Sequence, residues 1–495
     1  MCDTDCSDLV KIHTLEELDM SDSHFKANVC ALLCLPHLRV LHGPEKCSHA
    51  HGAPAEVSCT KLRTFSVHKC VSLPIVELSK MKELEEVSFS HCNLKTRDVV
   101  NLAGLQHLRI LSICSTDIGD SALRSLGKCA FLEKLNLSVS IYLIDVSPLA
   151  DVLTLEELNL RDCSCVKRGA GDLGRLPHLR ILNLKNTGVT DSCLVGLGTS
   201  RSLVKLVLSS CRFVTDITPV LGIATLEELN VLDCKEMTPK EHDLSRLPNL
   251  RSLSIGRLDH FASKGSDLTC PFGLTNLNLR CDYQLSPTSS FIEKMQTLVE
   301  LEVDDGLHIN LDGLSQLPHL RTLSLHSLRY PQGVNSLLKC TSITKLHLIR
   351  LYKSTDLCPL EDMKSLDELH LTSINLLPNS VIGIPPFLRH LKVASCNVTN
   401  KSFSKICNSN AFVYLKLLHC KHLTDISFVQ NMKRLEKFFL VCCGKVCNGL
   451  ECLIKLPFLH YVYITRSLFT ETLYSPLQEK GLTVIAHQFP QQLIL

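Results

Sequence analysis

The sequence lacks the segments that carry a protein into or across a membrane. Its 495 residues contain no tryptophan and only 5% aromatic residues, and no apolar run approaches the roughly 20 residues that a helix needs to cross a bilayer. The opening residues 1–5 are not followed by the basic and apolar segments of a secretory signal. We therefore expect no membrane insertion and an intracellular protein, cytoplasmic or nuclear.

The signatures of common enzyme classes are missing as well. We find no Walker A loop, no H-E-x-x-H metalloprotease motif, no G-x-S-x-G nucleophile elbow and no set of kinase motifs. The Gly-Leu-Gly at 196–198 is typical of a helix end and not of a phosphate-binding loop. The sequence therefore favours a protein that is not an enzyme, binds no cofactor and has no small-molecule substrate.

Cysteine, by contrast, is abundant, with 26 residues. Disulfide frameworks are typical of short secreted proteins, so in this long chain without a secretory signal we expect reduced thiols. Two groups have spacings that zinc ligands could use, Cys2, Cys6, Cys30 and Cys34 in one and Cys47, His49, His51 and Cys59 in the other. Small buried thiols explain the first group better, and zinc at the second, which shares one loop, is left open. The prediction is that no metal is bound.

One motif recurs along the whole chain. In Leu155-Glu156-Glu157-Leu158-Asn159-Leu160 the leucines occupy positions 1, 4 and 6, and Cys163 stands at position 9. The alternation of positions 4 and 6 is typical of a strand and excludes a purely amphipathic helix. The motif begins about 20 times between Leu15 and Leu459, at gaps of 22–24 residues, and a degraded copy begins at Leu482. It is the strand half of a leucine-rich repeat, so the sequence predicts an α/β solenoid.

The coils of this solenoid must stack to be stable. A coil of about 23 residues buries too few apolar side chains to fold alone, whereas stacked coils bury leucine against leucine and join their strands in a parallel sheet. Because helices are wider than strands, the stack should curve into a horseshoe with the sheet on its concave face. We expect one leucine-rich-repeat domain over residues 1–495, with a loop bulge at residues 44–58 that lacks the usual leucines.

The convex halves of the coils are of two kinds. The segment Asp120–Gly127 predicts a short helix with Asp120 as its N-cap and Gly127 at its end. Other coils carry a proline in the same place, such as Pro148 and Pro219, and proline removes a helical donor. Those coils are predicted to run extended or as 3₁₀ turns.

Position 9 turns inward and should hydrogen-bond the backbone of the adjoining coil, because buried amides need partners. Cysteine holds this position in a ladder of coils, at Cys70, Cys92, Cys163, Cys211, Cys234, Cys396, Cys420 and Cys443. The middle coils depart from it, with Leu258, Asp282, Gly306, Leu328, Leu351 and Ile374. We expect a bend or irregular loops in this middle part.

Positions 3 and 5 of the strand point to the concave face. Position 5 is small and nearly neutral in the first half of the chain and then becomes basic and finally aromatic, at His347, His370, Lys392, Lys416, Phe439 and Tyr463. Position 3 changes in the same way, at Lys345, His390, Tyr414, Lys437 and Tyr461. Exposed side chains of these kinds are enriched in interfaces, although a solvated sheet face with scattered charges is the alternative. We predict a partner-binding surface at these residues.

Charge is distributed unevenly along the chain. Residues 307–495 hold 20 Lys and Arg against 11 Asp and Glu, a net of +9, which leaves 32 (52 − 20) against 39 (50 − 11), or −7, for residues 1–306. The two ends should therefore carry opposite potentials. We expect an acidic protein partner on the C-terminal concave face, with nucleic acid as a weaker alternative.

The tract Leu84–Leu250 contains Leu-Glu-Glu-Leu-Asn-Leu, Leu-Pro-His-Leu-Arg-Ile-Leu-Asn-Leu and Gly-Val-Thr-Asp. It resembles the trypanosome leucine-rich-repeat proteins of the adenylate cyclase regulatory family. The resemblance implies a protein–protein interaction scaffold that regulates an adenylate cyclase. Members of that family carry a RING-like zinc segment ahead of the repeats, which we expect to be missing because Cys2 and Cys6 supply too few ligands. The competing function is the substrate-recognition arm of a ubiquitin ligase, with an F-box or RING partner outside this chain.

Overall fold

The structure is a computed structural model of the whole chain. It describes residues 8–487 apart from 22, 24–25, 28, 48–57, 71–72, 239–241, 257–272, 281–289, 305–310, 328–336, 352–354, 407–409, 466–467, 469–475 and 478–482. The described residues form two compact units, Met1–Ile255 and Gly256–Leu495. Most of the predicted loop bulge, with His49 and His51, lies outside them, as do four of the middle position-9 residues, namely Leu258, Asp282, Gly306 and Leu328.

The first unit contains a parallel sheet with one strand from each coil, in chain order. The strands are β1 (Glu17–Asp19), β3 (Val40–His42), β5 (Thr64–His68), β6 (Glu86–Ser90), β7 (Ile110–Cys114), β8 (Lys134–Asn136), β9 (Glu157–Asn159), β10 (Ile181–Asn183), β11 (Lys205–Val207), β12 (Glu228–Val231) and β13 (Ser252–Ile255). Equal motif positions face each other, as in Leu135 opposite Leu158 and Leu158 opposite Leu182. A separate parallel pair joins β2 (Lys26–Ala27) to β4 (Lys46–Cys47).

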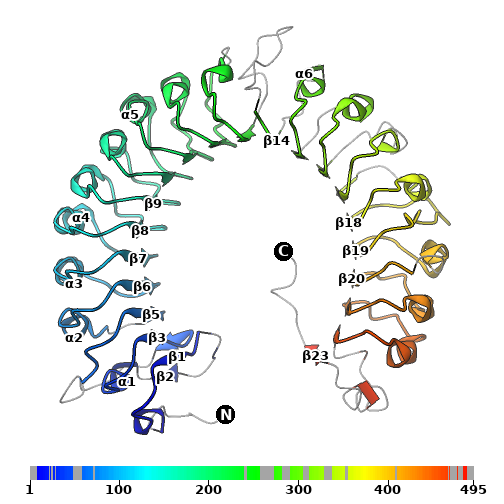
Figure 1. Cartoon of the computed structure of the whole chain (residues 1–495), viewed down its shortest axis with the longest axis horizontal. Coiled ribbons are helices and arrows are strands. Elements are labelled where there is room, and N and C mark those ends of the chain that lie inside the picture. The colour runs from blue at the N-terminus through cyan, green and yellow to red at the C-terminus, as the bar shows by residue number, and fades with distance from the viewer. Residues whose placement is uncertain are drawn as a thin grey trace. The chain divides into compact units, whose positions relative to one another are not determined.

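The second unit repeats this arrangement. Its strands are β14 (Asn276–Arg280), β15 (Glu300–Asp304), β16 (Thr322–His326), β17 (Lys345–Ile349), β18 (Glu368–Thr372), β19 (His390–Ala394), β20 (Tyr414–Leu418), β21 (Lys437–Val441), β22 (Tyr461–Thr465) and β23 (Thr483–His487). Each strand from β14 to β22 pairs in parallel with the next. Within each unit, taken by itself, the strands lie on the inner side of the arc and the helical segments on the outer side (Figure 1).

The outer segments are short, as the spacing of the coils requires. The α-helices are α1 (Val29–Leu32), α2 (Ile75–Leu78), α3 (Thr96–Leu102), α4 (Asp120–Leu126), α5 (Asp191–Leu197) and α6 (Ser290–Glu293). The 3₁₀ turns are η1 (Leu9–Lys11), η2 (Ser147–Asp151), η3 (Ala170–Arg175), η4 (Thr218–Gly222), η5 (Leu244–Arg246), η7 (Leu311–Gln316), η8 (Cys358–Asp362), η9 (Asn400–Phe403), η11 (Ser427–Asn431) and η12 (Leu450–Lys455). Both proline-containing segments singled out in the sequence are 3₁₀ turns, which confirms that expectation. None of the helices in the described part of the chain has the length and hydrophobicity to cross a bilayer.

The predicted N-cap of α4 is wrong by one residue. Gly119 occupies the cap, and Asp120 is the first helical residue. The Asp120 carboxylate instead accepts hydrogen bonds from the backbone N–H groups of Ile144 and Asp145 in the following coil, at 2.8 and 3.1 Å. Asp191 in α5 does the same for the coil that follows it. The side chain that the sequence predicted as a helix cap therefore links two neighbouring coils.

The core is the stack of motif leucines. Leu155, Leu158 and Leu160 are 0%, 1% and 0% exposed, and the equivalent apolar residues are buried in the described coils whose motifs begin between Leu38 and Leu459. In the first coil Leu15 and Leu18 are only half-buried. Each such leucine contributes roughly 1.5–3 kcal/mol by its removal from water. With repeating coils, a parallel sheet on one side and short helices or 3₁₀ turns on the other, the chain folds as a leucine-rich-repeat solenoid.

The ladder cysteines hydrogen-bond the backbone of the neighbouring coil. The thiols of Cys163, Cys211 and Cys234 donate to the carbonyls of Leu137, Leu184 and Leu208 at 3.1, 3.0 and 3.2 Å. The thiols of Cys92, Cys396, Cys420 and Cys443 make longer contacts of the same kind, at 3.7–3.8 Å. Cys70 donates its N–H to the Cys92 sulfur at 3.4 Å. A small polarizable side chain thus satisfies carbonyls left over where the sheet turns outward.

The residue at position 8 adopts a left-handed backbone in most described coils, with φ between 49° and 62°. These residues are Lys69, His91, Ser115, Val139, Asp162, Asn186, Ser210, Asp233, Ser327, Arg350, Ser373, Ser395, His419 and Cys442. The backbone N–H of Asp162, for example, donates to the Lys185 carbonyl of the next coil at 2.8 Å. The turn is therefore fixed by pairing between coils, and it is most strained at Val139, because a β-branched side chain rarely tolerates positive φ.

Substitution of Val139 by Asn should raise the stability of the chain. Asn tolerates the left-handed region better than Val, and little packing is lost because Val139 is 41% exposed. We expect a gain of about 1 kcal/mol, measured as the free energy of unfolding in urea by circular dichroism. Val139→Thr keeps the β-branch and should show no such gain; equal stabilisation by both changes would contradict the strain.

Thiol reactivity should follow burial. Burial raises the pKa of Cys163 to about 11 and that of Cys234 to about 12, whereas Cys165 and Cys447 are exposed. Because the thiolate is the nucleophile, iodoacetamide at pH 8 should label Cys165 and Cys447 roughly tenfold faster or more than Cys163 and Cys234 in the native protein. Peptide mass spectrometry measures the rates, and equal labelling of the two pairs before unfolding would contradict the ladder.

Candidate functional site

The strands β17–β22 bring the predicted interface residues together in two adjacent rows on the inner face. The position-3 row runs Lys345, Glu368, His390, Tyr414, Lys437 and Tyr461, each opposite the next. The position-5 row runs His347, His370, Lys392, Lys416, Phe439 and Tyr463 in the same register. We call these two rows the inner-face rows. Residues that are 22–24 positions apart in sequence become direct neighbours because the strands pair in register.

The later part of the inner-face rows is an aromatic cluster. The ring of Phe439 lies 5.3 Å from the rings of both Tyr414 and Tyr461 and 6.1 Å from that of Tyr463. The Lys416 Nζ lies 5.5 Å from the Phe439 ring centroid, within cation–π range. Rings that hold one another in this way lose little side-chain freedom when a partner binds.

Two of the predicted interface residues are less exposed than expected. Lys416 and Tyr463 retain only 6% and 5% of their surface, whereas a solvent-facing position was predicted for both. Tyr463 packs in a buried group with Ala394, Leu418 and Val441, which occupy position 7 of their strands, and Phe439 lies against it. Burial, and then the nearby charge of Lys392, lowers the pKa of Lys416. The sequence prediction did not include this apolar group, because it was based on positions 3 and 5 alone.

The other lysines of the inner-face rows differ in their surroundings. Lys345 lies 3.3 Å from Glu368, whereas Lys392 and Lys437 have no carboxylate within 4 Å among the residues that the structure describes. In the first unit the lysines of the same position are paired, with Lys134 and Lys205 each 2.6 Å from a glutamate on the next strand. Unpaired cations therefore gather on the inner face of the second unit.

The asparagines of the first unit serve its own backbone. At position 5 of β8, β9 and β10, the side-chain oxygens of Asn136, Asn159 and Asn183 accept the N–H two residues later at 3.0–3.1 Å. Each of these strands is three residues long. Strands β17–β22, which have no asparagine at position 5, are five residues long. The inner face of β8–β10 is thus committed to internal hydrogen bonds.

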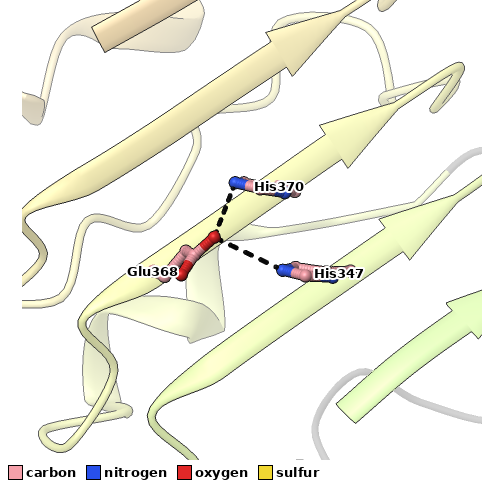
Figure 2. Close-up of side chains that lie close together, drawn as sticks. All are labelled: His347, Glu368 and His370. Carbon is pink, nitrogen blue, oxygen red and sulfur yellow. Dashed lines mark ion pairs between the residues drawn. The ribbon is translucent and has the colours of Figure 1, made fainter. Parts of the chain in front are cut away.

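Glu368 is the member of the inner-face rows that the sequence reading did not single out. Its Oε1 lies 2.9 Å from His370 Nε2 and 3.6 Å from His347 Nε2 (Figure 2). The rings of His347 and His370 stack with centroids 4.3 Å apart and an angle of 7° between their planes. The sequence does carry a signal for this group, namely a carboxylate at position 3 of one strand with histidines and a lysine near it on the same and the preceding strand. The signal appears only when the sequences of adjacent coils are aligned.

Burial shifts the pKa values in this group. It lowers the pKa of His370 to about 4, and the neighbouring His347 adds to the effect. Burial also lowers the pKa of His347. The pKa of Glu368 lies below its usual value although burial opposes this, because His370 and Lys345 favour the carboxylate. At neutral pH the group therefore consists of two neutral imidazoles and one carboxylate.

Comparisons with known proteins agree with the fold and with the resemblance read from the sequence. No family model matches the chain. A stretch of 167 residues, 34% of this chain, is 34% identical to the “Putative adenylate cyclase regulatory protein” of Trypanosoma equiperdum. The stretch covers 26% of that protein, so the chain spans about a quarter of its relative's length.

Solved structures are similar in fold at low sequence identity. The mouse RP105/MD-1 complex matches with a TM-score of 0.52 at 14% identity, over 96% of this chain and 89% of that one. A leucine-rich-repeat protein of Leptospira interrogans matches with a TM-score of 0.46 at 15% identity, over 84% of this chain and 92% of that one. At these identities the likeness concerns the fold alone.

The pKa of His370 predicts a pH dependence of stability. With a pKa of about 4 when folded against 6.5 when unperturbed, the unfolded chain binds a proton that the folded chain does not between these pH values. The free energy of unfolding should therefore fall as pH is lowered through this window. The groups facing the ring, Glu368, His347, His390 and Lys392, remain in place in a His370→Gln variant.

This His370→Gln change should remove about 1–2 kcal/mol of the stability difference between pH 7 and pH 5. Urea unfolding followed by circular dichroism measures it at both pH values. A Gln substitution at the exposed His460 should leave the difference unchanged. An identical pH dependence in wild type and His370→Gln would show that this ring titrates normally.

Proposed function

We propose that this protein is a non-catalytic scaffold that binds an acidic segment of a partner protein on the inner-face rows of β17–β22. The observation that carries the proposal is the gathering of unpaired lysines beside a packed aromatic cluster on one sheet face. Aromatic side chains supply contact area with little loss of freedom, and lysines favour acidic partners and speed their association. The net charge of +9 over residues 307–495 adds a long-range attraction of the same sign.

The first unit provides the contrast within the same chain. Its lysines at position 3 are paired, and its asparagines bind their own backbone. A partner would have to break these contacts to use them, whereas Lys392 and Lys437 are available without such a loss. This contrast supports a partner-binding surface on the second unit.

Regulation of an adenylate cyclase is the finer form of this proposal. It is supported by the name of the trypanosome relative and by the motifs that the tract Leu84–Leu250 shares with that family. A regulator of this kind acts by binding, which fits a surface without catalytic motifs. The alternative of a ubiquitin-ligase arm finds no support in these similarities.

Reversal of charge on the inner-face rows should abolish partner capture. We choose Lys392→Glu with Lys437→Glu, because Lys416 is buried and its substitution would disturb the fold. The immobilised full chain should capture a partner from a lysate of cells that naturally contain it, and the double variant should lose at least about tenfold of the captured protein. Mass spectrometry identifies the partner, which we expect to be an adenylate cyclase.

The matched control is Lys134→Glu with Lys205→Glu, the same residue type and the same change of net charge on the first unit. It should capture the partner as the wild type does. Equal capture by both double variants and the wild type would place the partner elsewhere on the molecule. Loss of capture after nuclease treatment would instead indicate nucleic acid as the ligand.

A further inference from the structure

A compact group of three donor side chains lies at the start of the inner-face rows. His347 stands on β17, and Glu368 and His370 stand two residues apart on β18, so all three project from one face of the sheet. Their ligand atoms lie within 4.8 Å of one another. Figure 2 shows the Glu368 carboxylate beside the two imidazole rings, with an ion pair to each. The three come from neighbouring strands of a regular sheet, which holds them more firmly than a loop would.

Ion pairing alone leaves part of this group unsatisfied. The carboxylate is 2.9 Å from His370 but 3.6 Å from His347, and the buried Nε2 of His347 has no hydrogen-bond partner among the described residues. A buried polar atom without a partner is uncommon and costs free energy. The stacked rings also bring one nitrogen atom of each within 4.8 Å of the other and of a carboxylate oxygen. A cation bound among the three side chains would give the His347 Nε2 atom a partner.

The surroundings provide the outer contacts that metal-binding histidines usually have. The Ser324 hydroxyl lies 3.1 Å from His347 Nδ1, which leaves Nε2 on the side of Glu368. Lys345 lies 3.3 Å from the second oxygen of Glu368 and fixes the carboxylate. Contacts of this kind orient the ligands and set which nitrogen carries the lone pair. Lys345 is 51% exposed, so its charge is largely screened by water.

We propose that His347, Glu368 and His370 form a binding site for a divalent transition metal ion, with zinc as the ion that suits it best. Two imidazoles and one carboxylate are a donor set that zinc uses with three protein ligands and an open position. The site needs no partner protein and does not rest on the proposed function.

Binding requires a small local movement. A tetrahedral zinc ion with bonds of about 2.0–2.1 Å holds its ligand atoms about 3.4 Å apart. The His370–Glu368 contact of 2.9 Å must therefore open and the His347–Glu368 distance of 3.6 Å must shorten slightly, while the two rings turn from their parallel stack toward a common point. Side-chain rotation suffices, because all three side chains are only partly buried, with 20–26% of their surface exposed. A fourth position then remains for water or for another ligand.

Cobalt is the probe that tests the site directly. Full-length protein, first freed of metal by a chelator and kept reduced, is titrated with Co²⁺ at pH 7.5 while its visible spectrum is recorded. We expect d–d absorption that rises with added Co²⁺ and levels off when this site is filled. The sulfur-to-cobalt charge-transfer band that thiolate ligands would give should be absent. Isothermal titration with Zn²⁺ alone should show the same site with higher affinity.

The variants His370→Gln and Glu368→Gln should each weaken metal binding at least about tenfold. Loss of an outer contact already lowers metal affinity by about this factor, and loss of a ligand should lower it more. The matched control is His326→Gln. His326 lies on the neighbouring strand β16, is as exposed as His347 and pairs with a single carboxylate, Glu302, at 3.6 Å. Its substitution should leave the cobalt spectrum unchanged.

Three results would overturn the proposal. They are the absence of d–d absorption in the reduced protein, absorption that is equally strong in wild type and both ligand variants, and a spectrum with a thiolate band that none of the changes affects. Circular dichroism of each variant checks that it is folded, and His347→Gln takes the place of any ligand variant that is not. Because no partner is present, failure here leaves the proposed protein-binding function untouched.

Discussion

In-register pairing between the parallel strands of successive coils is the constraint on which the rest of the structure depends. A single coil of about 23 residues cannot offset the entropy of its own ordering, so each coil is stable only against its neighbours. The pairing sets leucine against leucine in the core, as with Leu135, Leu158 and Leu182. It also fixes the turn after each strand, where the N–H of a left-handed residue such as Asp162 binds the next coil. The first residues of two helices also contribute to the contacts between coils, since the carboxylates of Asp120 and Asp191 accept hydrogen bonds from the backbone of the following coil.

Because equal positions stack, any repeated residue becomes a row across the sheet. Cysteine at position 9 gives a buried line of thiols that donate hydrogen bonds to carbonyls, and asparagine at position 5 of β8–β10 gives a row of side chains that accept hydrogen bonds from their own backbone. Where the repeat is relaxed, as from Lys345 onward, the same geometry gathers unlike side chains into one surface. The inner-face rows therefore hold stacked histidines, unpaired lysines and an aromatic cluster within a few strands. A repeat array can evolve a binding surface in this way without any change to its core.

The group of His347, Glu368 and His370 adjoins the basic aromatic surface on the same inner-face rows. The two would bind different kinds of ligand. The first depends on lone pairs of neutral imidazoles and on one carboxylate, so it is sensitive to protons and to transition metals. The second depends on cations that have no carboxylate partner among the described residues and on rings that hold one another in place. A partner that brings an acidic side chain to Lys392 would come close to His370, its neighbour in the position-5 row. The two proposals can therefore be combined, but each stands on its own contacts.

The sequence by itself determined the solenoid, because leucines at positions 1, 4 and 6 with a period of 22–24 residues admit one efficient way of burial. It also determined which residues share the inner face, since the strand alternates and the coils are of nearly equal length. It did not determine that Lys416 and Tyr463 would be covered, that Asp120 would bind the next coil, or that Glu368 would meet two histidines. These depend on side-chain directions and on contacts between coils more than twenty residues apart, which are set only when the strands pair. The position of each residue in the repeat could thus be taken from the local sequence. The exposure of its side chain, its contacts and its pKa were decided by the tertiary structure.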